Sequence, residues 1–179
     1  MRSPQQRVAT SIDILNTVHE EFDIIAETHK KEMRIYLDNC CYNRPFDEQA
    51  QLRVRLETVT KLAVQLLMAT RAVEYAWSGV LDYEISFNPF PKRQTSIMWW
   101  KEGAAVYVET TDEIIRRGEE IEQLGVKPKD ALHLASAEKA NCDMFLTTDR
   151  GILKKVPVLG RMKVVNPIQF ISEEYNANL

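Results

Sequence analysis

The stretch KDALHLASAEKANCDMFLTTDRGILKK, residues 129–155, decides the fold class of this chain. It combines a helix of small apolar residues with a short apolar strand, MFLTT. Asp130 opens the helix and Asp149 directly follows the strand. Because a carboxylate loses its hydration when it is buried, apolar segments normally exclude such groups. The two aspartates therefore need either water or a cation beside them.

The composition is that of an ordinary soluble globular protein. The 179 residues are 45% hydrophobic and 27% charged, which fits one compact domain with a sizeable core. No apolar run approaches the roughly 20 residues that span a membrane, so we expect no membrane association. The three cysteines form no CxxC pair, which argues against a disulfide framework and a zinc site and makes a cytoplasmic location the default.

The first 32 residues differ in pattern from the rest of the chain. Apolar residues recur there every three or four positions, at Val8, Ile12, Leu15, Val18, Phe22 and Ile25. This spacing predicts an amphipathic helix. A new start follows at Met33, where MRIYLD has the pattern of a first strand. We therefore expect a helical extension over residues 1–32 and an α/β domain over residues 33–179.

The domain alternates between strand and helix patterns. We predict strands at 34–37, 72–78, 106–109, 144–148 and 163–165, and helices at 48–70, 79–89, 93–104, 111–124 and 128–140. The helix at 48–70 has an apolar face at Leu52, Leu56, Val59, Leu62, Leu66 and Leu67. Thr110 and Glu113 form a capping box for the helix that ends before Gly125. The alternation predicts a parallel β-sheet flanked by helices on both faces.

Four acidic residues are placed where such a sheet would bring them together. Asp38 and Asp149 directly follow strands, and Asp130 opens a helix that leads into a strand. Glu84 lies early in the helix after the second strand, although Asp82 nearby is an alternative on another helix face. In an open parallel sheet, ligands bind at the carboxyl ends of the strands. We expect Asp38, Glu84, Asp130 and Asp149 to converge there.

Converging carboxylates repel one another unless a proton or a cation neutralises them. A hard divalent cation such as Mg²⁺ or Mn²⁺ prefers oxygen ligands, and the helix start near Asp130 favours the ionised carboxylate. An ion at this position can stabilise charge that builds up on a phosphate. The predicted reaction class is therefore metal-assisted phosphodiester hydrolysis.

The charge around these acids is locally positive. Residues 125–165 hold eight Lys or Arg against four acids, a net charge of +4, although the whole chain is at −3. From charge alone, a solvated surface is the more common explanation. The candidate phosphate contacts are Lys127, Lys129, Arg150, Lys154 and Lys155. His133 and Cys40 are expected to be packing residues, because neither is accompanied in sequence by a catalytic partner.

Three stretches resemble the motifs of PIN domains, a family of metal-dependent ribonucleases. They are RIYLDNCCYNRP, SGVLDYE and KPKDALHLASAEKANCDMFLTTDRGILKK, and the resemblance covers about Met33 to Phe170. Many members are toxins of bacterial VapBC-type toxin–antitoxin pairs. The resemblance implies a PIN-like fold, an RNA substrate, frequent homodimers and, for toxins, a cognate antitoxin. The extension at 1–32 and the long stretch NPFPKRQTSIMWW, residues 88–100, depart from the common pattern.

The resemblance also implies roles for particular residues. Asp38, Asp130 and Asp149 would hold Mg²⁺ or Mn²⁺, Glu84 would complete the site or orient a water, and Thr147 would orient the site from two residues before Asp149. The leading hypothesis is a metal-dependent RNA endonuclease. One alternative is a catalytically silent PIN-like module that binds RNA or protein. Another is a phosphatase with an aspartyl nucleophile, but such enzymes present Asp-x-Asp after the first strand, where this chain has Asp38-Asn39-Cys40.

Overall fold

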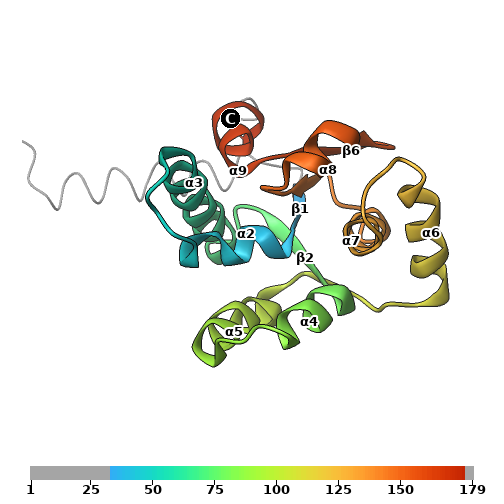
Figure 1. The fold of residues 1–179 in the computed structure, drawn as a ribbon, viewed down its shortest axis with the longest axis horizontal. Helices are drawn as coiled ribbons and strands as arrows, with labels where there is room; N and C mark the ends of the chain where they lie inside the picture. Colours follow the sequence, from blue (N-terminus) through green and yellow to red (C-terminus); the bar gives the residue numbers. More distant parts are fainter. Residues whose placement is uncertain (1–32, 176–179) are drawn as a thin grey trace, which may run out of the picture. The chain divides into compact units, whose positions relative to one another are not determined.

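Figure 1 shows the computed structural model of this chain, which describes residues 33–175. The helix predicted over residues 1–32 lies outside the described residues. Within residues 33–175, no helix combines the length and the apolar character that a membrane crossing requires.

A six-stranded sheet forms the centre of the domain. Its strands are β1 Arg34–Leu37, β2 Glu74–Ser78, β3 Val106–Val108, β4 Met144–Leu146, β5 Val158–Leu159 and β6 Met162–Val165. They lie in the order β3-β2-β1-β4-β6-β5, and every neighbouring pair is parallel except β5 with β6. The five predicted strands and the parallel sheet are confirmed. Only β5 was not predicted: it has two residues, too few for a periodic signal, and is reversed into β6 through Gly160 at φ 59°.

Helices connect the strands and cover the sheet. They are α2 Asn39–Asn43, η1 Arg44–Phe46, α3 Leu52–Ala69, α4 Gly79–Ser86, α5 Pro91–Met98, η2 Trp99–Gly103, α6 Asp112–Glu122, α7 Pro128–Lys139, α8 Arg150–Lys155, α9 Pro167–Gln169 and η3 Phe170–Tyr175. In Figure 1, α3 and α9 lie on one side of the sheet, and α6 and α7 on the other. The predicted layered α/β architecture is therefore confirmed.

Two predicted helix boundaries are corrected by the structure. The helix expected at 93–104 is divided into α5, which starts at Pro91, and the 3₁₀-helix η2. The predicted capping residue Thr110 is wrong by one position, because the side chain of Thr111 accepts the hydrogen bond from the Ile114 N–H. Gly125, at φ 85°, lies at the predicted stop. The sequence pattern alone does not decide which of two adjacent threonines caps a helix; the backbone geometry does.

The central strands are buried on both faces. Ile35, Tyr36 and Leu37 of β1 are fully buried, as are Phe145 and Leu146 of β4. Burial on both faces is expected for inner strands of a parallel sheet and explains why their sequences are nearly continuous apolar runs. The carboxyl ends of β1 and β4 are thus rigidly placed side by side.

Helix α3 exposes most of its apolar face and buries several polar residues, which is the reverse of a simple amphipathic helix. Of the six residues of its apolar face, only Leu67 is buried and the other five are exposed. The side toward the core instead carries Glu57, Lys61 and Gln65 together with Val64 and Met68. The sequence pattern correctly indicates an apolar face, but it cannot tell which face meets the core.

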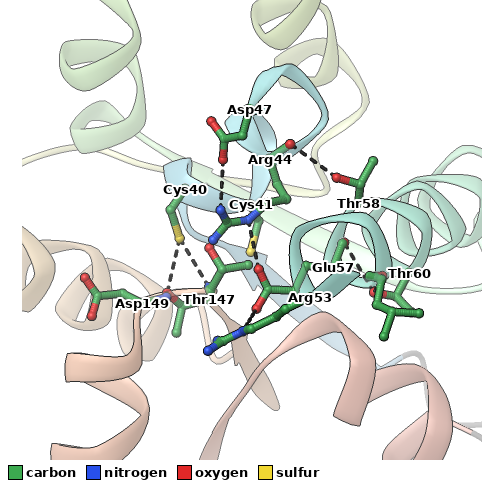
Figure 2. A network of polar contacts seen from close by, with 12 residues as sticks. Cys40, Cys41, Arg44, Asp47, Arg53, Glu57, Thr58, Thr60, Thr147 and Asp149 are labelled. Carbon is green, nitrogen blue, oxygen red and sulfur yellow. Dashed lines mark hydrogen bonds and ion pairs between the residues drawn. The ribbon is translucent and has the colours of Figure 1, made fainter. Parts of the chain in front are cut away.

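The buried polar groups of α3 are satisfied by partners close by. Glu57 forms ion pairs with Arg53, at 2.5 Å, and with Arg44 of η1, at 3.0 Å (Figure 2). Lys61 Nζ donates to Gln65 Oε1 at 2.6 Å. These contacts make the burial tolerable, since a buried polar group is costly mainly when it has no partner. Burial lowers the pKa of Lys61 to about 8, against a weaker opposing effect of Cys41.

We predict that Lys61 makes the stability of the domain depend on pH. Between about pH 8 and its ordinary value of 10.5, the folded state releases the Lys61 proton while the unfolded chain keeps it. The unfolded state then binds more protons, so the free energy of unfolding rises with pH across this window. Lys61→Met should remove this rise, which amounts to roughly 3 kcal/mol. Urea denaturation of both proteins at several pH values measures it.

Cys41 and Tyr42 of α2, which lie beside Lys61, are retained in both proteins. Their own pKa values are raised by burial, so their titration at high pH opposes that of Lys61 in the wild type and the variant. The quantity to compare is therefore the difference between the two proteins. Equal slopes across the window would contradict the assignment to Lys61.

Candidate metal centre

Asp38 stands at the carboxyl end of the central strand β1. Its backbone N–H donates to the Leu146 carbonyl at 2.9 Å, which ties the ends of β1 and β4 together. Its side chain is only 6% exposed. Oδ2 accepts a hydrogen bond from the Thr147 hydroxyl at 2.7 Å and another from the Cys40 thiol at 2.9 Å. Both contacts fix the orientation of the Asp38 carboxylate.

Thr147 connects Asp38 to Asp149. The buried Thr147 hydroxyl donates to Asp38 and accepts from the Asp149 N–H at 3.0 Å. Asp149 caps α8, because its Oδ1 accepts from the N–H groups of Gly151, at 2.5 Å, and Ile152, at 3.3 Å. A Cβ at Gly151 would lie 2.9 Å from this oxygen, so glycine leaves room for the carboxylate. The capping bonds use Oδ1 alone.

Figure 2 shows Cys40 next to Thr147, at the point where Asp149 begins α8. The Cys40 sulfur lies 3.3 Å from the Thr147 hydroxyl and accepts a hydrogen bond from the Thr148 N–H at 3.3 Å. Cys40 is only partly buried. The sequence predicted a packing residue, and the structure additionally places its thiol in contact with two residues of the acidic site.

Glu84, and not its neighbour Asp82, lies beside Asp38. Glu84 Oε1 forms an ion pair with Lys129 at 2.5 Å, and Oε2 accepts from His133 Nε2 at 3.0 Å. Asp82 is directed elsewhere, because it is bound by Trp77, Lys101 and Tyr107.

The two partners of Glu84 control its ionisation. Burial by itself raises the pKa of this carboxyl group, but the hydrogen bonds from His133 and Lys129 outweigh burial and lower the pKa to about 2. Glu84 is therefore ionised near neutral pH. Its negative charge is neutralised by groups of the protein itself.

A buried hydrogen-bond chain holds His133 in place. His133 is 1% exposed, and its Nδ1 lies 2.8 Å from the hydroxyl of Tyr36, which in turn lies 2.6 Å from the hydroxyl of Ser78. Sequence reasoning treated His133 as a packing residue and missed its contact with Glu84. The available signal was its spacing: His133 follows Asp130 by three positions, so both lie on the same face of α7.

Within the described part of the chain, Asp38, Glu84 and His133 form a group that could hold a metal ion. One ligand atom from each lies within 4.8 Å of the others. Carboxylate oxygens suit Mg²⁺ and Mn²⁺, and an imidazole nitrogen is acceptable to Mn²⁺. The predicted ligands Asp130 and Asp149 lie outside this tightest group.

Asp130 is nevertheless within the electrostatic field of the other aspartates. It lies in the first turn of α7 and is half-buried. Burial raises its pKa first, and the charges of Asp38 and Asp149 raise it further. The carboxylates of three separate segments therefore repel one another at this sheet edge. A divalent cation would relieve this repulsion, so the residues present fit such an ion.

The five predicted phosphate contacts differ in how they are engaged. Lys127, Lys129, Arg150, Lys154 and Lys155 are all exposed. Lys129 is paired with Glu84, and Lys155 donates to the carbonyl of Gly125, next to the α6–α7 connection. Lys129 and Lys155 are therefore already engaged with groups of the protein.

Comparisons with known proteins address the family. The family model of the PIN domain matches residues 99–159. This segment contains Asp130, Thr147 and Asp149, whereas Asp38 and Glu84 precede it and are brought to it by the fold. One chain of the crystal structure of VapBC2 from Rickettsia felis, bound to a DNA fragment from their promoter, is similar with 14% identity and a TM-score of 0.44, over 74% of this chain and 98% of that chain.

No curated protein matches the chain. The family-model match includes the whole stretch from Lys129 to Lys155. It confirms, over residues 99–159, the resemblance to PIN domains that the motifs indicate.

Proposed function

We propose that this protein is a metal-dependent endoribonuclease that hydrolyses phosphodiester bonds. The proposal is supported by the grouping of Asp38 and Glu84 within 4.8 Å of each other, with Thr147 hydrogen-bonded to Asp38 and to the Asp149 N–H, and with Asp130 close enough for Asp38 and Asp149 to raise its pKa. A protein that only binds RNA gains nothing from a cluster of mutually repelling carboxylates. Such a cluster is instead suited to holding a divalent cation next to a phosphate.

In this proposal, Asp38, Asp130 and Asp149 hold Mg²⁺ or Mn²⁺. When bound, the ion would supply an activated water and stabilise negative charge on the phosphate. Thr147 is a positioning residue: by donating to Oδ2 of Asp38, it fixes the plane of that carboxylate. Capping of α8 has the same effect on Asp149, because its Oδ1 is held by two backbone N–H groups.

Glu84 would complete the site by orienting a water or the ion. The chain of hydrogen bonds from Ser78 through Tyr36 and His133 ends on its Oε2 and sets its direction. Lys129, which pairs with Oε1, lies next to the position a phosphate would take. The approach of a phosphate would offer Lys129 a second anionic partner, so Lys129 can bind the substrate backbone without leaving the site.

The partners follow from the resemblance to VapBC-type toxins. We propose RNA as substrate, with the exposed basic residues Lys127, Arg150 and Lys154 at its backbone. A cognate antitoxin, a homodimer and a cytoplasmic location belong to the same proposal. Sedimentation velocity of the purified chain distinguishes a monomer from a dimer.

Cleavage of RNA should depend on the aspartates that follow β1 and β4. With Mn²⁺ or Mg²⁺ present, we expect Asp38→Asn and Asp149→Asn to lower kcat/KM for a single-stranded RNA at least about a hundredfold, or roughly 2.7 kcal/mol of transition-state stabilisation. Asparagine caps helices as well as aspartate does, so Asp149→Asn should keep α8 intact. A fluorogenic RNA substrate measures the rates.

The control for this experiment is Asp112→Asn, in the first turn of α6. Asp112 is exposed and lies at the start of a helix, as Asp130 does, but it is outside the acidic site. Its activity should equal that of the wild type. Variants of Asp38 and Asp149 that cleave RNA as fast as this control would refute the nuclease proposal.

Asp130→Asn should stabilise the metal-free protein, because it removes a carboxylate that Asp38 and Asp149 repel. Since Asp112→Asn loses the same interaction with a helix N-terminus, we expect the free energy of unfolding without metal to be about 1 kcal/mol higher in Asp130→Asn than in Asp112→Asn. Asp112→Asn should lower it by about 0.3–1 kcal/mol, since it only loses an interaction with a helix N-terminus. Thermal unfolding in EDTA compares the two.

Added Mn²⁺ provides the second half of this test. A hundredfold excess over Kd stabilises a binding protein by about 2.7 kcal/mol. The wild type and Asp112→Asn should show such a gain, and Asp130→Asn should show much less. An undiminished gain in Asp130→Asn would remove Asp130 from the set of ligands.

A further inference from the structure

We propose that a pocket next to Glu84 binds a nucleobase of the RNA that flanks the cleaved phosphodiester. This inference rests on the proposed nuclease function and names a contact of its substrate. The pocket, called here the aromatic pocket, is defined by Tyr83 and Phe87, by the amides Asn39, Asn43 and Asn88, and by Arg93. Glu84 and Lys129 complete its wall.

The position of the aromatic pocket ties it to the acidic site. Glu84 and Lys129 belong to both, so a molecule in the pocket lies directly beside the carboxylate cluster. The cavity volume is about 350 Å³, at the lower end of small-ligand sites. This size suits one nucleotide rather than a folded partner. Its outer wall comes from the connection of α4 to α5, in the stretch 88–100 that is longer than the PIN pattern predicts.

Two aromatic side chains that line this pocket are largely exposed to solvent. Tyr83 is 64% exposed and Phe87 is 69% exposed, although both are large and apolar. Their ring centroids lie 4.8 Å apart in an edge-to-face arrangement with an interplanar angle of 67°. This contact keeps the two rings in a fixed orientation. Exposed aromatic faces are the usual surface on which proteins stack the bases of single-stranded RNA.

A chain of hydrogen-bonded carboxamides also lines the pocket. Asn88 Nδ2 donates to Asn43 Oδ1 at 3.2 Å, and Asn43 Nδ2 donates to Asn39 Oδ1 at 2.9 Å. Asn39 receives the last bond, so its own NH₂ group is not used by this chain. Carboxamides present both donors and acceptors, which match the edges of bases. Asn39 directly follows Asp38, so a base held there is adjacent to the acidic site.

The charged residues of the pocket suit the sugar–phosphate backbone. The Arg93 guanidinium lies over the rings of Phe90, at 4.6 Å, and Phe46, at 4.8 Å, and is thereby held at the rim. Lys129 lies on the side of Glu84. Two cations that line the same pocket as the aromatic rings suit the phosphates that flank a stacked base. An apolar protein side chain would use the rings but would leave the carboxamides and cations without a role.

Fluorescence anisotropy tests the pocket separately from catalysis. All proteins carry Asp38→Asn to prevent cleavage, and the probes are a short labelled single-stranded RNA of mixed sequence and an abasic ribose-phosphate strand of equal length. Phe87→Ala and Tyr83→Ala should each raise the Kd for RNA roughly tenfold, the effect of losing one stacked base. The Kd for the abasic strand should not change.

The matched control is Trp99→Ala. Trp99 is 64% exposed, like Tyr83, but lies at the start of η2 and outside the pocket. Its substitution should leave both Kd values unchanged. Since Phe87 and Tyr83 are exposed, neither alanine should unfold the protein, and circular dichroism checks this.

The outcomes separate the pocket from the proposed function. If the wild type cleaves RNA, Asp38→Asn does not, and both pocket variants bind RNA normally, the pocket proposal is overturned and the nuclease remains. If Asp38→Asn cleaves like the wild type, the nuclease proposal fails whatever the pocket does. Pocket variants that lose self-association but keep RNA binding would identify a protein interface and also overturn the proposal.

Discussion

The burial of β1 and β4 on both faces, which fixes their carboxyl ends side by side, is the constraint on which the acidic site depends. The strands β1 and β4 are buried on both faces, so their carboxyl ends cannot move apart to separate Asp38 from Asp149. The domain instead satisfies each carboxylate by a different local device. Asp38 accepts from Thr147 and Cys40, Asp149 caps α8, and Glu84 is paired with Lys129 and His133.

The strands and the order of their acids could be predicted from sequence because they depend on local patterns. An apolar run followed by aspartate places that aspartate at a carboxyl edge whatever the remaining topology. The orientation of α3 could not be predicted in this way. Its apolar residues form a face, but the buried partners of Glu57 and Lys61 come from η1 and from α3 itself, and this complementarity is visible only in three dimensions.

The site residues that could be predicted depend on local sequence patterns, whereas those that were missed depend on contacts between distant segments. Asp38 and Asp149 directly follow the predicted strands 34–37 and 144–148, so their positions could be derived from the chain alone, whereas the role of Thr147 was implied by the family resemblance. His133 acquires its environment from Tyr36, Ser78 and Glu84, which belong to three other segments. The aromatic pocket likewise combines residues of α2, α4 and α5 with the start of α7. Sequence periodicity gives no information about such combinations.

Of the four acidic residues, Asp130 is the one whose carboxylate is least neutralised by other groups of the protein. Its pKa is raised by burial and by Asp38 and Asp149, whereas the pKa of Glu84 is lowered by its own cationic partner and His133. A site that neutralised all of its acids internally would have no affinity left for an ion. Asp38, Asp149 and Glu84 thus each have hydrogen-bonding or ionic partners within the protein, whereas burial and the charges of Asp38 and Asp149 raise the pKa of Asp130. Under the proposed function, a divalent cation would relieve this repulsion, so binding of the ion and stability of the metal-free fold would be opposed at Asp130.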